Sequence, residues 1–267
     1  MKIAVTGGTG RVGGRVAELL TATGQHEVVA LNSRTAAYDD PPALRAAFSG
    51  VDTLVFVSSD GEAARVVVHH RNVLDAAIAA GVGHVVLLSG LDVAPDSPFC
   101  YAFTNGDTER LLRASGLAYS IVRAGLFAEF FLSLVRGASD PAALPGAGGS
   151  VALPAADARV SLVARDDVAR CLAALALGAP TNGEHDVIGP ASLTVAEVVE
   201  KAGFAHEETS VAEFAATLAR RGEEPWWVYA YCSMFESVKQ GRWERTSDAV
   251  TALTGRQPAS FEQVLNA

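Results

Sequence analysis

The first fourteen residues constrain the fold more than any other stretch of this chain. A short apolar run ends at Val5 and is followed by a cluster of glycines. A helical pattern begins directly after them, because apolar residues recur on one helix face at Val12, Val16, Leu19 and Leu20. Strand, glycine turn and helix in this order form the context that a dinucleotide-binding fingerprint requires.

The glycines fit that fingerprint in two ways. Gly8, Gly10 and Gly13 match the G-x-G-x-x-G spacing. Gly7, Gly10 and Gly13 also match the wider G-x-x-G-x-x-G spacing. Glycine is needed because the turn is tight, the backbone approaches a diphosphate closely, and the helix packs hard on the strand. The helix N-terminus then presents N–H groups and a positive dipole end to the phosphates. The pattern predicts a nucleotide-binding turn, with a purely structural strand–helix turn as the alternative.

Composition excludes several classes of protein. Of 267 residues, 49% are hydrophobic and 19% are charged, which allows a large core and argues against global disorder. The net charge is −9 and no basic run exceeds two residues, so we expect no nucleic-acid partner. An acidic protein that binds a phosphorylated cofactor must build its own local positive field.

Cysteine usage and hydropathy favour the cytoplasm. Cys100, Cys171 and Cys232 are far apart and form no C-x-x-C pair, so we expect free thiols rather than a disulfide framework or a metal site. The N-terminus shows no charged leader before an apolar signal core, and no apolar run approaches the roughly 18 residues of a membrane span. We therefore expect a cytoplasmic protein with no bound metal and no membrane contact.

The first half of the chain alternates strand and helix patterns. After the first strand and helix, further strands are predicted at 27–31, 53–58, 85–88 and 119–122, and helices at 42–48, 62–80 and 108–115. The strand at 53–58 is a continuous apolar run, which is typical of a strand buried on both faces. The alternation predicts an α/β fold with a Rossmann-like, doubly wound parallel sheet.

The regular alternation of strand and helix patterns ends after about residue 130. Residues 138–156 are rich in Gly, Pro and Ala and read as irregular. Later patterns predict strands at 160–163 and 184–188, helices at 166–177, 194–202 and 210–221, an aromatic cluster at 226–235, and a helix–turn–helix tail at 247–267. We expect residues 1–130, with 157–190 contributing, to form an NAD(P)-binding domain. Residues 131–156 and 191–267 would form a smaller C-terminal α/β substrate lobe.

The end of the second strand bears on the choice of dinucleotide. An NAD-binding turn usually carries an acid at this position to hold the ribose hydroxyls, but here the chain reads Leu31, Asn32, Ser33, Arg34. A guanidinium can grip a 2′-phosphate that a carboxylate would repel. Arg11 can add a second positive charge, so NADPH is favoured over NADH. The alternative is that Arg34 is solvated and Asn32 only forms a turn.

Motifs in a fixed order extend along nearly the whole chain. They are Val5 to Gly13, Val57-Ser58-Ser59, His70 to Val73, Ala76 to Val82, Thr108-Glu109, Ala114 to Tyr119, Arg123-Ala124-Gly125 and Leu253 to Pro258. In this order they resemble the NmrA-like branch of the atypical short-chain dehydrogenase/reductase superfamily. Within that branch the chain is most similar to bacterial NAD(P)H:quinone oxidoreductases of the QOR2 type. The resemblance implies NADPH binding, a Rossmann-like domain, and a smaller C-terminal lobe that forms the substrate cleft.

Two departures from the family pattern bear on the site. Between Arg34 and Tyr38 the chain lacks the helix and strand that the family normally has, which implies a more open adenine end and leaves Ser33 or Arg34 in the family's arginine place. Ordinary members also use Tyr-x-x-x-Lys plus a serine. Here Tyr101 precedes Asn105 by four residues, and Asn105 is neutral, although it can still hydrogen-bond a ribose hydroxyl.

The candidate residues follow from these patterns and from the resemblance. The cofactor-binding candidates are Gly7, Thr9, Gly10, Arg11, Val12, Gly13, Asn32, Ser33, Arg34, Val57, Ser58, Ser59 and Asn105, and the catalytic candidates are Tyr101, Ser89 and Asn105. Tyr101 either donates a proton or lines the cleft, and Ser89 either donates a proton or forms a hydrogen bond at the strand end. The phenylalanines at 127, 130 and 131 either stack on a flat substrate or belong to the core. The aromatic cluster at 226–235 suits a pocket, helix packing or a homodimer contact.

A hydride-transferring oxidoreductase is the favoured activity. A quinone needs little acid catalysis because its reduced form is aromatic, so loss of the Tyr–Lys pair is better tolerated for quinones than for simple ketones. We therefore expect NADPH-dependent reduction of a quinone or a similar flat carbonyl compound. The alternatives are a non-catalytic regulator that senses NADP(H) and a natural-product ketoreductase.

Overall fold

A parallel sheet forms the centre of the molecule. The computed structural model describes residues 1–138 and 149–267. Six strands pair in the order β10-β5-β4-β3-β1-β2, and every neighbouring pair is parallel. Their bounds are β1 Lys2–Val5, β2 Glu27–Ala30, β3 Thr53–Val57, β4 His84–Gly90, β5 Ala118–Ala124 and β10 Glu184–Val187. The predicted doubly wound parallel sheet is confirmed.

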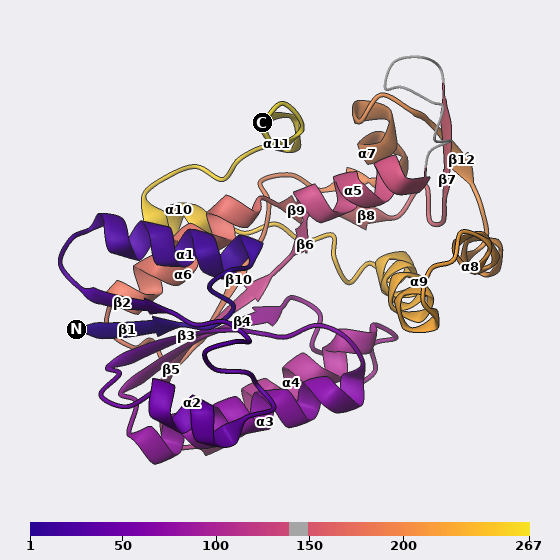
Figure 1. Cartoon of the computed structure of the whole chain (residues 1–267). Helices are drawn as coiled ribbons and strands as arrows, with labels where there is room; N and C mark the ends of the chain where they lie inside the picture. Colours follow the sequence, from indigo (N-terminus) through magenta and orange to yellow (C-terminus); the bar gives the residue numbers. More distant parts are fainter. Residues whose placement is uncertain (139–148) are drawn as a thin grey trace.

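Helices cover both faces of this sheet, as the two layers of Figure 1 show. One layer contains α1 (Arg11–Ala22), α6 (Arg165–Leu177) and α10 (Ala249–Thr254), and the other contains α2 (Pro41–Ala47), α3 (Ala63–Ala80) and α4 (Cys100–Ala114). Each layer buries its own apolar cluster against the strands. Asp40 caps α2 by accepting a hydrogen bond from the Ala43 backbone, and Gly81 ends α3 in the left-handed conformation.

The sheet ends at β2. In the order of strands β2 pairs only with β1, and the chain then turns through residues 33–36 toward α2. The outer edge of β2 is therefore left partly exposed beside the glycine turn.

The second lobe lies beyond the carboxyl ends of the central strands (Figure 1). Its helices are α5 (Ala128–Ala138), α7 (Val195–Lys201), α8 (Val211–Arg220), α9 (Pro225–Lys239) and α11 (Phe261–Leu265). Three short sheets join β6 (Leu126–Phe127) to β9 (Leu162–Val163), β7 (Ser150–Leu153) to β12 (Ala205–Glu208), and β8 (Arg159–Val160) to β11 (Leu193–Thr194). These elements share one apolar cluster.

Three expected elements differ from the structure. The helix predicted at 108–115 begins at Cys100, because burial of Ala102 and Thr104 outweighs the weak helix propensity of its first turns. Residues 138–156 are not uniformly irregular, since α5 reaches Ala138 and β7 lies inside the range, while 139–148 fall outside the described residues. The strand predicted at 160–163 is two short strands, and the ladder breaks at Ser161, whose backbone N–H donates to the Trp243 carbonyl at 2.7 Å and whose hydroxyl donates to the Glu244 carbonyl at 3.1 Å.

Candidate functional site

A cavity of about 680 Å³ opens at the carboxyl ends of the central strands. It is bounded by the glycine turn, by the ends of β3, β4 and β5, and by aromatic side chains of the second lobe. Of the predicted residues it brings together Gly7, Gly10, Arg11, Val12, Gly13, Val57, Ser58, Ser59, Ser89, Tyr101 and Asn105. Four other predicted residues do not line it: Thr9, Asn32, Ser33 and Arg34.

The glycine turn has the sterics that the fingerprint predicts. Gly7 adopts a φ of +62°, and its carbonyl accepts a 2.8 Å hydrogen bond from the Gly10 backbone. A Cβ on Gly13 would lie 2.4 Å from the Gly7 carbonyl oxygen, so α1 can pack this closely only with glycine there. No side chain caps α1 at Gly10. The N-terminus of α1 therefore opens onto the cavity with no acidic side chain in its first turn.

The residues after β2 form a self-contained turn. The Asn32 side chain accepts from the Arg34 backbone at 2.9 Å, the Asn32 carbonyl accepts from the backbones of Thr35 and Ala36, and the Asn32 N–H donates to Thr35 Oγ1 at 3.0 Å. Asn32 therefore stabilises the turn after β2 through its own hydrogen bonds. The Arg34 side chain is exposed at the open edge of the sheet and forms no ion pair with the described residues.

A buried histidine fixes the loop after β3. His70 Nε2 accepts a 2.9 Å hydrogen bond from the Ser59 backbone, and Nδ1 lies 2.7 Å from Thr108 Oγ1. Thr108 donates its own proton to the Thr104 carbonyl, so Nδ1 must carry the imidazole hydrogen. Burial lowers the pKa of His70 to about 4, which keeps the ring neutral. This role of His70 was not predicted from the sequence, although His70 and Thr108 both lie in the motifs that carry the resemblance.

The loop held by His70 leaves one hydroxyl without a partner. Ser59 Oγ is buried and forms no hydrogen bond within the described part of the chain, yet Ser59 lines the cavity. A buried hydroxyl without a partner is costly, and a polar ligand in the cavity would supply one. A sugar hydroxyl or phosphate oxygen of a dinucleotide would be such a partner.

Ser89 is occupied by a buried carboxylate. Its hydroxyl donates to Glu109 Oε1 at 2.7 Å, and Glu109 also accepts from Arg123 at 2.6 and 2.9 Å and from Arg113 at 2.8 Å. Burial alone would raise the pKa of the Glu109 carboxyl, but Arg123, Ser89 and Arg113 together hold it below its usual range. Because its proton is engaged, Ser89 can offer the cavity only lone pairs. Glu109 and Arg123 are site-supporting residues that sequence reasoning did not single out.

Tyr101 and Asn105 share one face of α4. The Tyr101 hydroxyl accepts a 3.0 Å hydrogen bond from the Gly61 backbone, and no group among the described residues accepts its proton. Burial raises the pKa of the phenol. Asn105 lies one turn later, with its amide nitrogen 2.9 Å from where a Cβ on Gly90 would stand. Both polar side chains therefore line the cavity beside the carboxyl end of β4.

The far wall of the cavity is aromatic. Phe130 stacks on Tyr231 with ring centroids 6.0 Å apart, and Phe127 and Trp227 complete the wall. Phe131 is fully buried and belongs to the core. The aromatic residues of α9 are thus divided between the cavity and the packing of the second lobe. A flat ring is the shape that such a wall accommodates.

Known proteins share this chain's sequence pattern and fold. A family model described as NAD(P)H-binding matches residues 7–178. Quinone oxidoreductase 2 of Escherichia coli (strain K12) is 31% identical, over 82% of each chain. An NAD(P)H azoreductase of Xenophilus azovorans is 32% identical, over 73% of this chain and 71% of its own. The NADPH complex of an Escherichia coli NADPH-dependent quinone oxidoreductase superposes with a TM-score of 0.87 at 25% identity, covering 99% of this chain and 98% of that one.

Proposed function

This chain belongs to the NAD(P)H-binding family, and from that premise we propose that it is an NADPH-dependent oxidoreductase that transfers hydride to a quinone or a similar flat carbonyl acceptor. The observation that carries the proposal is one cavity that joins the glycine turn to an aromatic wall. Relatives named as a quinone oxidoreductase and an azoreductase support a flat, electron-poor acceptor.

The residues around the cavity fit a pyridine nucleotide. The unpartnered Ser59 hydroxyl, the glycine turn without a Cβ at Gly13, and the uncapped start of α1 suit a sugar and a diphosphate. Asn105 offers a neutral amide to a ribose hydroxyl. When bound, the nicotinamide supplies the hydride, and the protein's part is to orient the two rings and to exclude water.

Tyr101 is proposed to stabilise the oxygen of the acceptor. Its hydroxyl accepts from the Gly61 N–H, which polarises the phenol, and its proton is left to donate into the cavity. Its raised pKa makes it a hydrogen-bond donor rather than a strong acid. Asn105 cannot lower that pKa by charge, which suits a quinone better than a ketone.

Replacing Tyr101 by phenylalanine tests this role. Tyr101→Phe is expected to lower kcat for menadione by about tenfold, below the roughly 10²–10⁴-fold typical of a full general acid. Dissociation constants for NADPH should not change. The control is Tyr229→Phe, a side chain that is 53% exposed and does not line the cavity. If kcat is unchanged in Tyr101→Phe, the Tyr101 hydroxyl does not stabilise the acceptor and the side chain only lines the cavity.

Arg34 is proposed to hold the 2′-phosphate of NADPH at the open edge of the sheet. Arg34→Ala is expected to weaken NADPH binding by about tenfold, since one charge-assisted contact is lost, and to leave NADH binding unchanged. The measurement is the quenching of protein fluorescence by each coenzyme, with Arg45→Ala on α2 as an equally charged control. Equal losses for both coenzymes would refute the assignment, and Ser33 would then become the next candidate.

The activity itself is tested with purified protein, NADPH and a panel of quinones. The proposal predicts steady oxidation of NADPH that depends on the quinone. Tight NADPH binding without turnover on any acceptor would favour the regulator, and turnover on ketones alone would favour the ketoreductase. The oxidoreductases among the relatives favour the enzyme over the regulator.

The remaining expectations from the sequence are also proposals. We propose that residues 1–130 and 157–190 bind the nucleotide while 131–156 and 191–267 bind the acceptor, with α10 packing back onto α6. No helix within the described residues is long and apolar enough to span a bilayer. All three cysteines are free thiols, which supports our proposal of a cytoplasmic location. A homodimer remains a proposal that light scattering would test.

A further inference from the structure

The charged residues around the cavity do not match the charge of the whole chain. The protein carries a net charge of −9, yet the cavity is lined by two arginines, Arg11 and Arg165, and by one acid, Asp60. Of these two, Arg11 was predicted from the sequence and Arg165 was not. The local positive field that an acidic protein needs for a phosphorylated ligand is therefore built by these two side chains.

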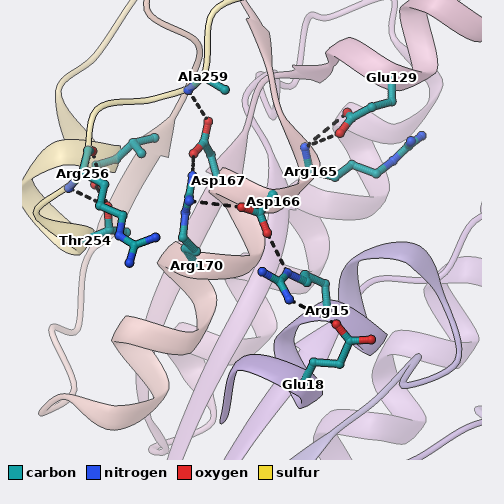
Figure 2. A network of polar contacts seen from close by, with 11 residues as sticks. Arg15, Glu18, Glu129, Arg165, Asp166, Asp167, Arg170, Thr254, Arg256 and Ala259 are labelled. Carbon is teal, nitrogen blue, oxygen red and sulfur yellow. Dashed lines mark hydrogen bonds and ion pairs between the residues drawn. The ribbon is translucent and has the colours of Figure 1, made fainter. Parts of the chain in front are cut away.

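The two arginines stand at the N-termini of adjacent helices. Arg11 opens α1 and Arg165 opens α6, and α1 packs along α6. Arg15, one turn after Arg11, forms a 2.7 Å ion pair with Asp166, the residue after Arg165 (Figure 2). The ion pair ties the two helix starts together, and Arg11 and Arg165 both line the cavity.

The acids near Arg165 are engaged by other groups. Asp166 pairs with Arg15 and with Arg170, and Asp167 accepts from Arg170 and from the Ala259 backbone at 2.7 Å. In Figure 2 the Arg165 side chain extends away from this network. These acids therefore leave the positive charge of Arg165 uncompensated.

Glu129 does not neutralise Arg165 either. Its carboxylate accepts from the Arg165 backbone nitrogen at 3.0 and 3.2 Å, and no carboxylate of the described chain lies within ion-pair distance of the Arg165 guanidinium. The guanidinium instead lies over the Phe127 ring, 5.4 Å from its centroid. Burial lowers the pKa of Arg165, and the charge of Arg11 adds to this against the opposite pull of Glu129. The Arg165 guanidinium is thus half-buried and forms no ion pair within the described residues, which suits it to bind an anionic ligand.

We propose that Arg165 binds the cofactor's diphosphate together with Arg11, closing over the phosphates from the side of α6 while the glycine turn holds them from the side of α1. A diphosphate carries two negative charges, which two guanidiniums match with their fork geometry. The inference rests on the nucleotide binding contained in the proposed function. It assigns to Arg165 a role that the glycine fingerprint does not give it.

The test compares Arg165→Gln, Arg165→Lys and the surface control Arg45→Gln by titration with NADPH. Arg165→Gln is expected to raise the dissociation constant of NADPH by roughly 10- to 100-fold, as expected for one lost charge-assisted contact. Arg165→Lys keeps the charge and should recover part of the affinity, and Arg45→Gln should leave the constant unchanged. Equal constants in Arg165→Gln and wild type would overturn the proposal.

The thermal midpoint of the cofactor-free protein separates binding from folding. Because the charge of Arg165 is unfavourable before a ligand binds, Arg165→Gln should keep or raise that midpoint while it weakens NADPH binding. A midpoint lowered in proportion to the lost affinity would assign Arg165 a structural role and contradict the proposal.

An acceptor that carries an anionic substituent is the alternative ligand for Arg165. Steady-state rates of wild type and Arg165→Gln, measured with neutral menadione and with a naphthoquinone sulfonate, distinguish the two ligands. If Arg165→Gln raises the KM of the sulfonate alone and leaves NADPH binding unchanged, Arg165 binds the acceptor and the proposal is overturned. The proposed function fails separately, if wild-type protein binds NADPH but reduces no quinone.

Discussion

Gly13→Val is expected to abolish NADPH binding. The glycine position already places a new Cβ 2.4 Å from the Gly7 carbonyl oxygen and 2.7 Å from the Thr6 carbonyl oxygen, and both are backbone atoms that cannot rotate aside. The start of α1 must therefore move away from the turn, and the N–H groups that face the diphosphate move with it. We expect the dissociation constant for NADPH to rise at least about 100-fold, which is about 2.7 kcal/mol of binding free energy. Fluorescence titration measures this loss.

The same substitution should also lower the stability of the free protein. Overpacking at a helix–strand contact typically costs about 1–3 kcal/mol in the free energy of unfolding, which leaves the protein folded at room temperature. Gly178→Ala at the end of α6 is the control, because its Cβ would meet nothing closer than 3.4 Å. Full NADPH affinity in a folded Gly13→Val protein would show that the turn is structural only.

Glu109→Gln should be the most destabilising of the conservative changes around the site. Glu109 is 1% exposed and accepts from Arg113, Arg123 and Ser89. Removing one partner of a buried ion network leaves the remaining charges uncompensated, at a cost of about 3–5 kcal/mol in the free energy of unfolding. The matched control is Glu184→Gln: Glu184 also pairs with Arg113, but its side chain is 37% exposed, so its loss should cost less than about 1 kcal/mol. Urea denaturation measures both.

The pH dependence of stability gives Glu109 a second signature. Its folded pKa lies below the ordinary value of 4.5, so the folded state favours the ionised form more than the unfolded state does. The stabilisation is complete above the unfolded pKa and is lost as the pH falls through the folded pKa. Wild type should therefore lose stability more steeply below pH 4.5 than Glu109→Gln does. Parallel pH profiles for the two proteins would contradict the assigned network.

The part of the site that sequence could predict lies within short stretches of chain. The turn from Gly7 to Gly13 needs glycine for reasons that act over seven residues, so its spacing was enough. The parallel sheet followed from the alternation of apolar strands and helices. Each of these signals is local.

The supporting contacts could not be predicted because they join distant residues. His70 reaches Ser59 and Thr108, and the Arg15–Asp166 contact spans 151 positions. Such contacts arise from packing of α1 on α6 or of α3 on α4, which no spacing rule encodes. Arg165 was missed for the same reason: only the folded chain shows that its neighbouring acids are already engaged.

The central claim is that the glycine turn at the start of the chain holds the diphosphate of a pyridine nucleotide. Isothermal titration calorimetry of the folded wild-type protein with NADPH and with NADP⁺ tests it most directly. The account predicts one saturable site per chain, with the affinity for NADPH lost in Gly13→Val and retained in Gly178→Ala. Absence of binding heat with both coenzyme forms at several temperatures would contradict it.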